Sequence, residues 1–464
     1  MNGVLTREVA NQLPLAEAVL RMWDNIAQPE FLDDVFERYR GRSYESVIRF
    51  PLFVNLISEA LLEHHGSGRQ SFTRSIEAGD LPATMQAAYG KLRRIPPSLS
   101  MGLLSEGSAR LHELFPVGLA ADKIPDSLRG TEIFFHDGKT IKHVAKRLKV
   151  LEKFQGKAVG GRLVVTQSLS TGMVVAMGAD EDGQSGEQPL VPDVLRQTRA
   201  AFAEAGRLHV ADRQYCDLIQ MERFAAEGDG FLLRWNRKLA FSRDEQWKPL
   251  RGVDRYGRTY TEDWGWVGSG QRRRYVRRIH LHRDGREDVV LLTNLLDPAD
   301  SPADDLLEVY LHRWGIERTF QKVTEVFNLK ALIGGSPRAT VFQASFCFLL
   351  YNMTQVIRAY IAEGAQREAE TISLELLFYD VHRQLTAWTE VVKPKQTVEL
   401  LSTTWTPAQA ARRLGQLLHG AWSDRWIKSP SNTHKSVSKQ RNEYPSGGHI
   451  SVFRAMQKAR ASPR

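Results

Sequence analysis

Five short apolar runs between residues 131 and 235 constrain the fold of this chain most strongly. They read EIFFHD, RLVVTQSL, GMVVAMG, RLHVAD and GFLLRW, and residues 192–205 and 214–226 carry apolar residues at helical spacing between the later runs. Short runs of this kind, bounded by turn residues, are typical of buried strands. The order strand, strand, strand, helix, strand, helix, strand predicts an α/β fold, in which a mixed sheet carries flanking helices.

The segments before and after these five runs have different residue patterns. Residues 1–125 show apolar positions three and four apart, which predicts an all-helical N-terminal domain. Residues 236–292 are polar, rich in arginine and punctuated by glycines, which predicts a β-rich insert. The insert interrupts a domain that we expect to span residues 126–365.

The C-terminal half is predicted to be helical. Residues 303–329 predict one long helix, and 341–356 predict a buried helix, because Gln343 and Asn352 interrupt a run shorter than the roughly 20 residues of a membrane span. Residues 366–464 predict a helical C-terminal region that ends in a basic tail, whose composition from 429 to 448 is that of a solvated arm.

Length and composition exclude several classes of protein. A chain of 464 residues exceeds the size of one hydrophobic core, so two or three domains are expected. With 42% hydrophobic and 25% charged residues, the chain is neither disordered, collagen-like nor membrane-embedded. The N-terminus lacks a secretion signal and the two cysteines are too few for a disulfide framework, which predicts a protein of a reducing cytoplasm.

The positive charge is clustered, which favours a polyanionic partner. The net charge is +9, and residues 425–464 hold nine Lys or Arg against Glu443 alone. Residues 271–283 and 138–157 form two further basic runs. Each run by itself is equally typical of a solvated face. We predict that the following side chains bind phosphates: Arg272, Arg273, Arg274, Arg277, Arg278, Lys139 and Lys142.

Three acids form a candidate catalytic set. Asp137 and Asp212 each end an apolar run, at the edge of a sheet where ligands bind, although a lone Asp there is more often a turn residue. Tyr310, Arg313 and Glu317 share one helix face, a spacing that an ordinary surface ion pair also produces. Taken together, three carboxylates beside dense arginine suit Mg²⁺, and two such ions support an in-line displacement at phosphorus.

These residues resemble the DDE transposases of bacterial insertion sequences, in the group with a Tyr-x2-Arg-x3-Glu-x6-Lys signature. The resemblance rests on HDGKTIKHV, VADRQYCD, LLTNLLDP and YLHRWGIERTF. It implies a ribonuclease-H-like domain in which Asp137, Asp212 and Glu317 are catalytic and hold two Mg²⁺ or Mn²⁺ ions. It also implies that Tyr310 and Arg313 contact phosphates near the transposon terminus. At the position of the signature Lys this chain has Thr324.

The resemblance further implies the reaction and the partners. The chain would cleave transposon ends and join the freed 3′-hydroxyl to target DNA. It would act as a homodimer that holds terminal inverted repeats, with residues 1–125 binding DNA, and it would be associated with the bacterial nucleoid. Trp264 or Trp266 would capture a base flipped out of the DNA end, whereas packing inside the insert is the ordinary role for an indole there. Two alternatives are a metal-dependent DNA nuclease without strand transfer and a catalytically inactive DNA-binding descendant.

Overall fold

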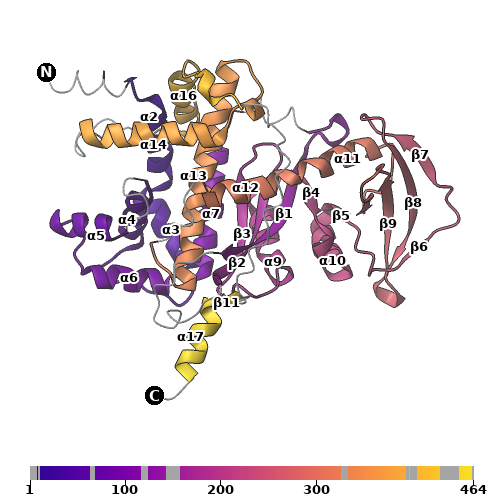
Figure 1. The fold of residues 1–464 in the computed structure, drawn as a ribbon, viewed down its shortest axis with the longest axis horizontal. Helices are drawn as coiled ribbons and strands as arrows, with labels where there is room; N and C mark the ends of the chain where they lie inside the picture. The colour runs from indigo at the N-terminus through magenta and orange to yellow at the C-terminus, as the bar shows by residue number, and fades with distance from the viewer. Residues whose placement is uncertain are drawn as a thin grey trace.

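The computed structural model of the chain describes residues 8, 11–62, 68–116, 124–142, 157–325, 333–392, 397, 405–428 and 449–461. Figure 1 shows a group of helices at one end, a sheet in the middle and a β-rich lobe at the other end. The chain crosses between the two ends through helices α11 (Ala303–His312) and α12 (Trp314–Glu325).

The five predicted strands form the middle of the sheet. They are β1 (Thr131–Lys142), β2 (Lys157–Ser168), β3 (Val174–Asp180), β4 (Gly206–Ala211) and β5 (Gly230–Arg234). Their order is β3-β2-β1-β4-β5, with β2 antiparallel to β1 and β3, and with β1, β4 and β5 parallel. This is the ribonuclease-H arrangement, so the predicted fold class is confirmed.

Both faces of the sheet are covered, which explains why its strands are apolar without alternation. Successive residues of β2 enter different hydrophobic clusters: Val165 packs in the main core, and Val164 packs with Val194 of α9 (Val191–Ala201). On the α9 side lies α10 (Leu218–Ala225). On the other side lie α7 (Pro97–His112), α12 and α13 (Pro337–Gly364).

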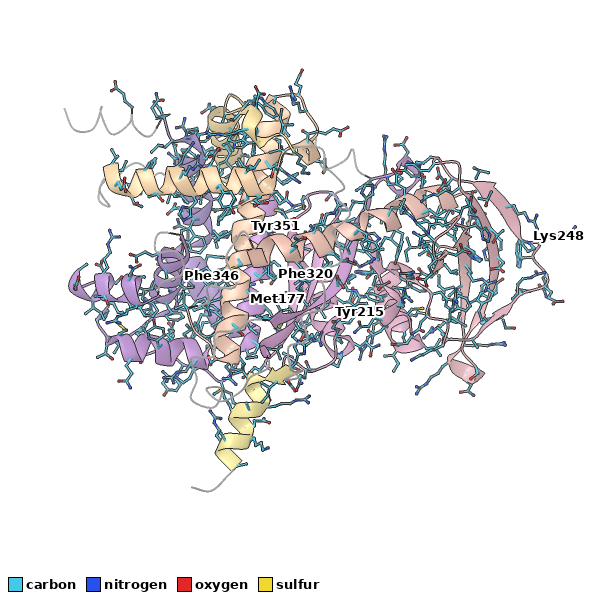
Figure 2. All side chains as sticks on the ribbon, viewed as in Figure 1. Met177, Tyr215, Lys248, Phe320, Phe346 and Tyr351 are labelled. Carbon is cyan, nitrogen blue, oxygen red and sulfur yellow. The ribbon has the colours of Figure 1, made fainter. Side chains whose placement is uncertain are left out.

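The β-rich insert continues the central sheet rather than standing apart from it. Its strands are β6 (Phe241–Arg243), β7 (Leu250–Val253), β8 (Thr259–Val267) and β9 (Arg274–Leu281), followed by β10 (Val289–Thr293). Strand β10 pairs with β5 on one side and β9 on the other, so hydrogen bonds run unbroken along β4-β5-β10-β9-β8. Lys248 marks the outer end of this lobe (Figure 2).

The N-terminal region is helical, as predicted, and it shares a hydrophobic core with the sheet. Its helices are α2 (Pro14–Ile26), α3 (Pro29–Tyr39), α4 (Phe50–Leu62), α5 (Gly68–Glu77) and α6 (Met85–Arg94). They pack around α13 together with α14 (Leu374–Val391) and α16 (Pro407–Leu418), in the cluster that also contains Ile133 of β1. The domain boundaries at residues 125 and 365 stay predictions.

Helix α13 contains the run predicted to be a buried helix. Its polar residue Asn352 forms hydrogen bonds with the sheet. The side-chain amide accepts from the backbone N–H of Val174 at 2.8 Å and donates to the Val174 carbonyl at 2.8 Å. It also donates to the Ser108 hydroxyl of α7 at 2.9 Å. Such an amide fixes the helix against the outer strand β3. Within the described residues, no helix combines the length and the apolarity needed to cross a bilayer.

The end of the chain returns to the sheet, which the sequence did not predict. Strand β11 (His449–Ser451) pairs in parallel with the start of β2, and α17 (Val452–Ala461) follows it. Arg454 forms an ion pair with Asp182 at 2.5 Å, and Val452 packs on Ala158. The basic arm predicted at residues 429–448 lies outside the described residues.

Candidate active site

Tyr310, Arg313 and Glu317 lie where α11 meets α12, and not on one continuous helix as the sequence predicted. The backbone tightens at Arg313, whose N–H donates to the Tyr310 carbonyl and whose carbonyl accepts from Ile316, both at 3.1 Å and three residues apart. Arg313 keeps α-helical torsions, so the break only shifts the helix locally. The ion pair of Arg313 with Glu317 survives at 3.2 Å.

Asp137 lies within β1 and faces a cavity of about 400 Å³ that Glu317 also lines. Lys139, Trp314 and Arg318 also line this cavity. Burial raises the pKa of Asp137 to about 6, and the carboxylates of Glu187 and Glu317 add to this effect, although its bond to the Gly138 N–H opposes it. A buried acid with nearby acids is typical of a functional site.

Asp212 directly follows β4, next to Asp137 on the neighbouring parallel strand. The Tyr310 hydroxyl donates to its Oδ1 at 3.4 Å, and Arg234, at the end of β5, is 3.9 Å from the same oxygen. Sequence reasoning missed Arg234, yet it ends the apolar run GFLLRW, and the carboxyl ends of parallel strands meet at one edge of the sheet. That pattern was a usable signal.

Arg313 connects the three acids. Its side chain is 3% exposed, and it lies near enough to Asp212 and Asp137 for both to act on its charge. Burial alone would lower the pKa of Arg313, but Tyr310, Asp212 and Asp137 together raise it. The guanidinium therefore stays charged and offsets the repulsion among the three carboxylates, of which Asp137 is largely buried and Glu317 is exposed.

A fourth acid, Glu187, supports the site from behind β1, and nothing in the sequence pointed to it. Glu187 accepts from Arg162 at 2.8 Å and from the Tyr215 hydroxyl at 3.0 Å. Burial raises the pKa of Tyr215 well above its usual value, and the charges of Glu187 and Asp137 add to the rise. The Glu187 carboxylate lies directly over Gly138, where a Cβ would come within 1.8 Å of its carboxyl carbon.

This close approach gives a prediction for Gly138. We expect Gly138→Ala to displace Glu187, to destabilise the protein by about 1–3 kcal/mol and to reduce any activity that depends on Asp137. Chemical unfolding measures the first effect. Gly186→Ala is the matched control, because a Cβ there meets only Pro189 at an ordinary 3.5 Å. If Gly138→Ala is as stable as Gly186→Ala, the contact with Glu187 is not restrictive.

The carboxylates fit hard divalent cations such as Mg²⁺ or Mn²⁺. The donors are oxygens, and the raised pKa of Asp137 shows that negative charge there is not fully compensated by Arg313. The ligand atoms of Asp137, Asp212 and Glu317 do not all lie within 4.8 Å of one another. In the described part of the chain, those of His280, His282 and Asp288 in the insert do. Two ions 3.5–4 Å apart can be bound by carboxylates that lie further from one another than the ligands of a single ion.

The predicted phosphate-binding arginines divide into two groups. Arg272, Arg273 and Arg274 are exposed at the start of β9, although Arg274 also pairs with Glu222 at 3.2 Å. Arg277 is 0% exposed, and its Nε donates to Glu262 at 2.6 Å. Because alternate residues of a strand point to opposite faces, Arg277 points into the packed face. Its prediction as a phosphate ligand is therefore corrected to a structural role.

Arg278 and the two tryptophans also have protein partners. Arg278 forms two bonds to Asp263, at 2.8 and 2.6 Å, which leaves its charge compensated. Trp264 is 7% exposed and donates to the Leu296 carbonyl at 2.9 Å, as a packed indole does. Trp266 is half-buried, with Arg273 over its ring at 4.2 Å and Tyr275 against its edge. Of the two, only Trp266 stays a candidate for base contact.

The predicted lysines are only partly described. Lys139 is half-buried, lines the cavity beside Asp137 and places its ammonium 5.5 Å from the Phe320 ring centre. The side chains of Lys142 and Thr324, and residues 143–156 of the basic run, lie outside the described residues.

Comparisons with known proteins find similarity to transposases. A family model described as the transposase DDE domain matches residues 128–353. A probable transposase for insertion sequence element IS5377 of Geobacillus stearothermophilus is 24% identical over 204 residues, which cover 43% of this chain and 49% of that protein. The match thus spans about half the length of this relative.

Among solved structures, a piggyBac transposase in a synaptic complex with hairpin DNA aligns with 93% of this chain and 91% of that chain, at 10% identity and a TM-score of 0.38. That likeness is too low to carry an argument here. The matched residues 128–353 include Asp137, Asp212 and Glu317 together with the insert. Residues 128–353, just under half of the chain, therefore carry the similarity to the transposase DDE domain.

Proposed function

We propose that this protein cleaves the ends of a DNA transposon and joins the freed 3′-hydroxyl to target DNA. The observation that carries the proposal is the meeting of Asp137 and Glu317 at one cavity, with Asp212 linked to them through Arg313 and Tyr310. The acids come from two neighbouring parallel strands and a helix junction, so distant parts of the sequence supply one site.

Asp137, Asp212 and Glu317 would hold two Mg²⁺ or Mn²⁺ ions, and DDE transposases act with divalent metal ions. Such ions activate an attacking oxygen and stabilise the departing one. Arg313 keeps the unliganded carboxylates together, and Tyr310 orients Asp212. Burial raises the pKa of Tyr310 to about 12, so its hydroxyl stays protonated as a donor. Lys139 and Arg318 line the cavity with positive charge for a phosphodiester.

The test uses purified protein and a duplex that ends in the inverted repeat flanking its gene. With Mn²⁺ at low salt, we expect nicking at the repeat terminus and, with a target plasmid added, a joined product. A cut duplex without a joined product would favour a nuclease. Binding of the repeat without any cut would favour an inactive DNA-binding descendant. Two ends must be held for joining, so we propose a homodimer as the active assembly.

The three exposed arginines at the start of β9 give a separate prediction. Replacing Arg272, Arg273 and Arg274 together by Gln removes exposed cations without disturbing the packed Arg277. We expect weaker binding to all DNA sequences alike, and a plot of log affinity against log salt whose slope falls by up to about 3.

Fluorescence anisotropy at four salt concentrations measures this slope. Arg412→Gln is the control, because Arg412 is exposed on α16 at the helical end of the molecule. An unchanged slope in the triple variant would show that this part of β9 does not touch DNA.

A further inference from the structure

Arg358, on α13, is a buried cation. It is 7% exposed, and its Nε lacks a hydrogen-bond acceptor. Across the described residues, no carboxylate forms an ion pair with it. Burial lowers the pKa of Arg358, and the charges of Tyr351 and Glu370 act in the opposite direction. An unpaired buried charge is costly, so a fold retains one where something else binds it.

Arg358 lines a cavity of about 840 Å³ between α12, α13 and the turn after β2. Two further cations, Arg318 of α12 and Lys428, line the same cavity. Burial lowers the pKa of Lys428, and repulsion from Arg358 and Arg318 adds to this effect. Three cations therefore face one space closely enough to repel one another.

Carboxylates also line this cavity, and some of them are already paired with arginine. Arg255, at the other end, is held by Asp304, Asp305 and Glu308, so those carboxylates are already paired. Glu368 and Glu370 also line the cavity, Lys428 donates to the backbone carbonyl of Glu370, and the charge of Glu370 acts on both Lys428 and Arg358. The buried Gln355 Oε1 of the same cavity also lacks a hydrogen-bond donor.

We propose that Arg358, Arg318 and Lys428 form a phosphate-binding subsite, and that its ligand is a backbone phosphodiester of DNA. Trp314 and Arg318 line both this cavity and the one that holds Asp137 and Glu317. A strand leaving the carboxylates over the exposed Trp314 therefore reaches Arg318 first and Arg358 next. The subsite would hold the strand at a fixed distance from the bond that is cut, and this assignment to DNA rests on the proposed function.

The first arm of the test needs no catalysis. Thermal unfolding of the full chain is compared in sodium phosphate and in sodium chloride at equal ionic strength and pH. We expect phosphate to raise the melting temperature by roughly 2 °C. Arg358→Met should abolish this rise without lowering the melting temperature in chloride, because it removes an uncompensated buried charge. Lys428→Gln, at an exposed position, should reduce the rise, and Arg412→Gln should leave it unchanged.

The second arm identifies the source of the phosphate. For duplex DNA, Arg358→Met should lower the slope of log affinity against log salt by about 1, since one phosphate contact is lost. A phosphate effect that is lost while the DNA slope is unchanged would assign the subsite to a free anion and overturn the DNA ligand.

Two other outcomes overturn the subsite itself. One is a phosphate effect that persists in Arg358→Met and Lys428→Gln. The other is a fall of several degrees for Arg358→Met in chloride, which would mean that the guanidinium has a structural partner. If no DNA is ever cleaved but both arms succeed, the proposed reaction fails and the subsite stands, so the two failures are distinguishable.

Discussion

Replacing Asp137, Asp212 or Glu317 singly by alanine is expected to reduce DNA cleavage by more than about 100-fold, beyond the loss typical of residues that only support a metal ligand. DNA affinity should stay the same or rise, because each change removes a negative charge from a surface that faces phosphates. For Asp137 the melting temperature should not fall, because burial raises its pKa to about 6 and its charge already costs stability.

Single-turnover cleavage and anisotropy on the same DNA give the two readouts. Glu204→Ala is the control, since Glu204 is exposed beyond the end of α9. Activity that persists in any of the three variants would remove that acid from the catalytic set. A variant that loses cleavage and melting temperature together would point to a structural role instead.

The largest effect on stability is expected at Asp229, which ends a buried chain of polar side chains behind the site. Asp229 accepts from Arg199 at 2.8 Å, from Arg207 at 2.7 Å and from His209 at 3.1 Å, and His209 bonds His136 at 2.9 Å. Asp229→Ala leaves Arg199 and Arg207, both partly buried, with only their longer ion pairs to the exposed Glu227, at 3.7 Å each. We expect a loss of about 3–5 kcal/mol in the free energy of unfolding at pH 7.

The pH dependence of this loss follows from the pKa of Asp229. Burial acts to raise it, but hydrogen bonds from His209, Arg199 and Arg207 dominate and lower it to about 2, against 3.8 for a free Asp. The contribution is complete above about pH 4 and disappears as the pH falls towards 2, because the unfolded chain takes up the proton first.

Denaturant unfolding of wild type and Asp229→Ala at pH 7, 4 and 2.5 measures the difference. It should be largest at pH 7 and shrink at pH 2.5. Asp193→Asn is the control, because its pair with the exposed Arg196 is a surface ion pair worth little. A difference that does not change with pH would mean that the charge of Asp229 is unimportant.

Local sequence patterns were sufficient for the sheet and for the acids. The apolar runs gave all five central strands because burial on both faces leaves a continuous hydrophobic signal. Asp137 and Asp212 could be placed together because their strands are parallel neighbours, with Phe135 opposite Val210. The roles of these acids stay predictions until cleavage is measured.

The missed features depend on contacts between residues far apart in the chain. Glu187 lies over Gly138 only because a loop folds back across β1, and no local pattern encodes that contact. A count of arginines in QRRRYVRRIHLHR does not show that Arg277 points inward. The pairing of β11 with β2 joins segments almost 300 residues apart, and the sequence predicted only a basic tail in this region.

The unbroken run of hydrogen bonds from β4 to β9 has a mechanical consequence. Because the lobe is an extension of the same sheet, it cannot swing as a separate flap without tearing the β5–β10 or β10–β9 ladder. Three strand spacings, roughly 14 Å, separate the strand before Asp212 from the one that begins at Arg274. The sheet therefore fixes the distance between the carboxylates and the start of β9. This distance would determine how far from the carboxylates a rigid DNA duplex can be bound.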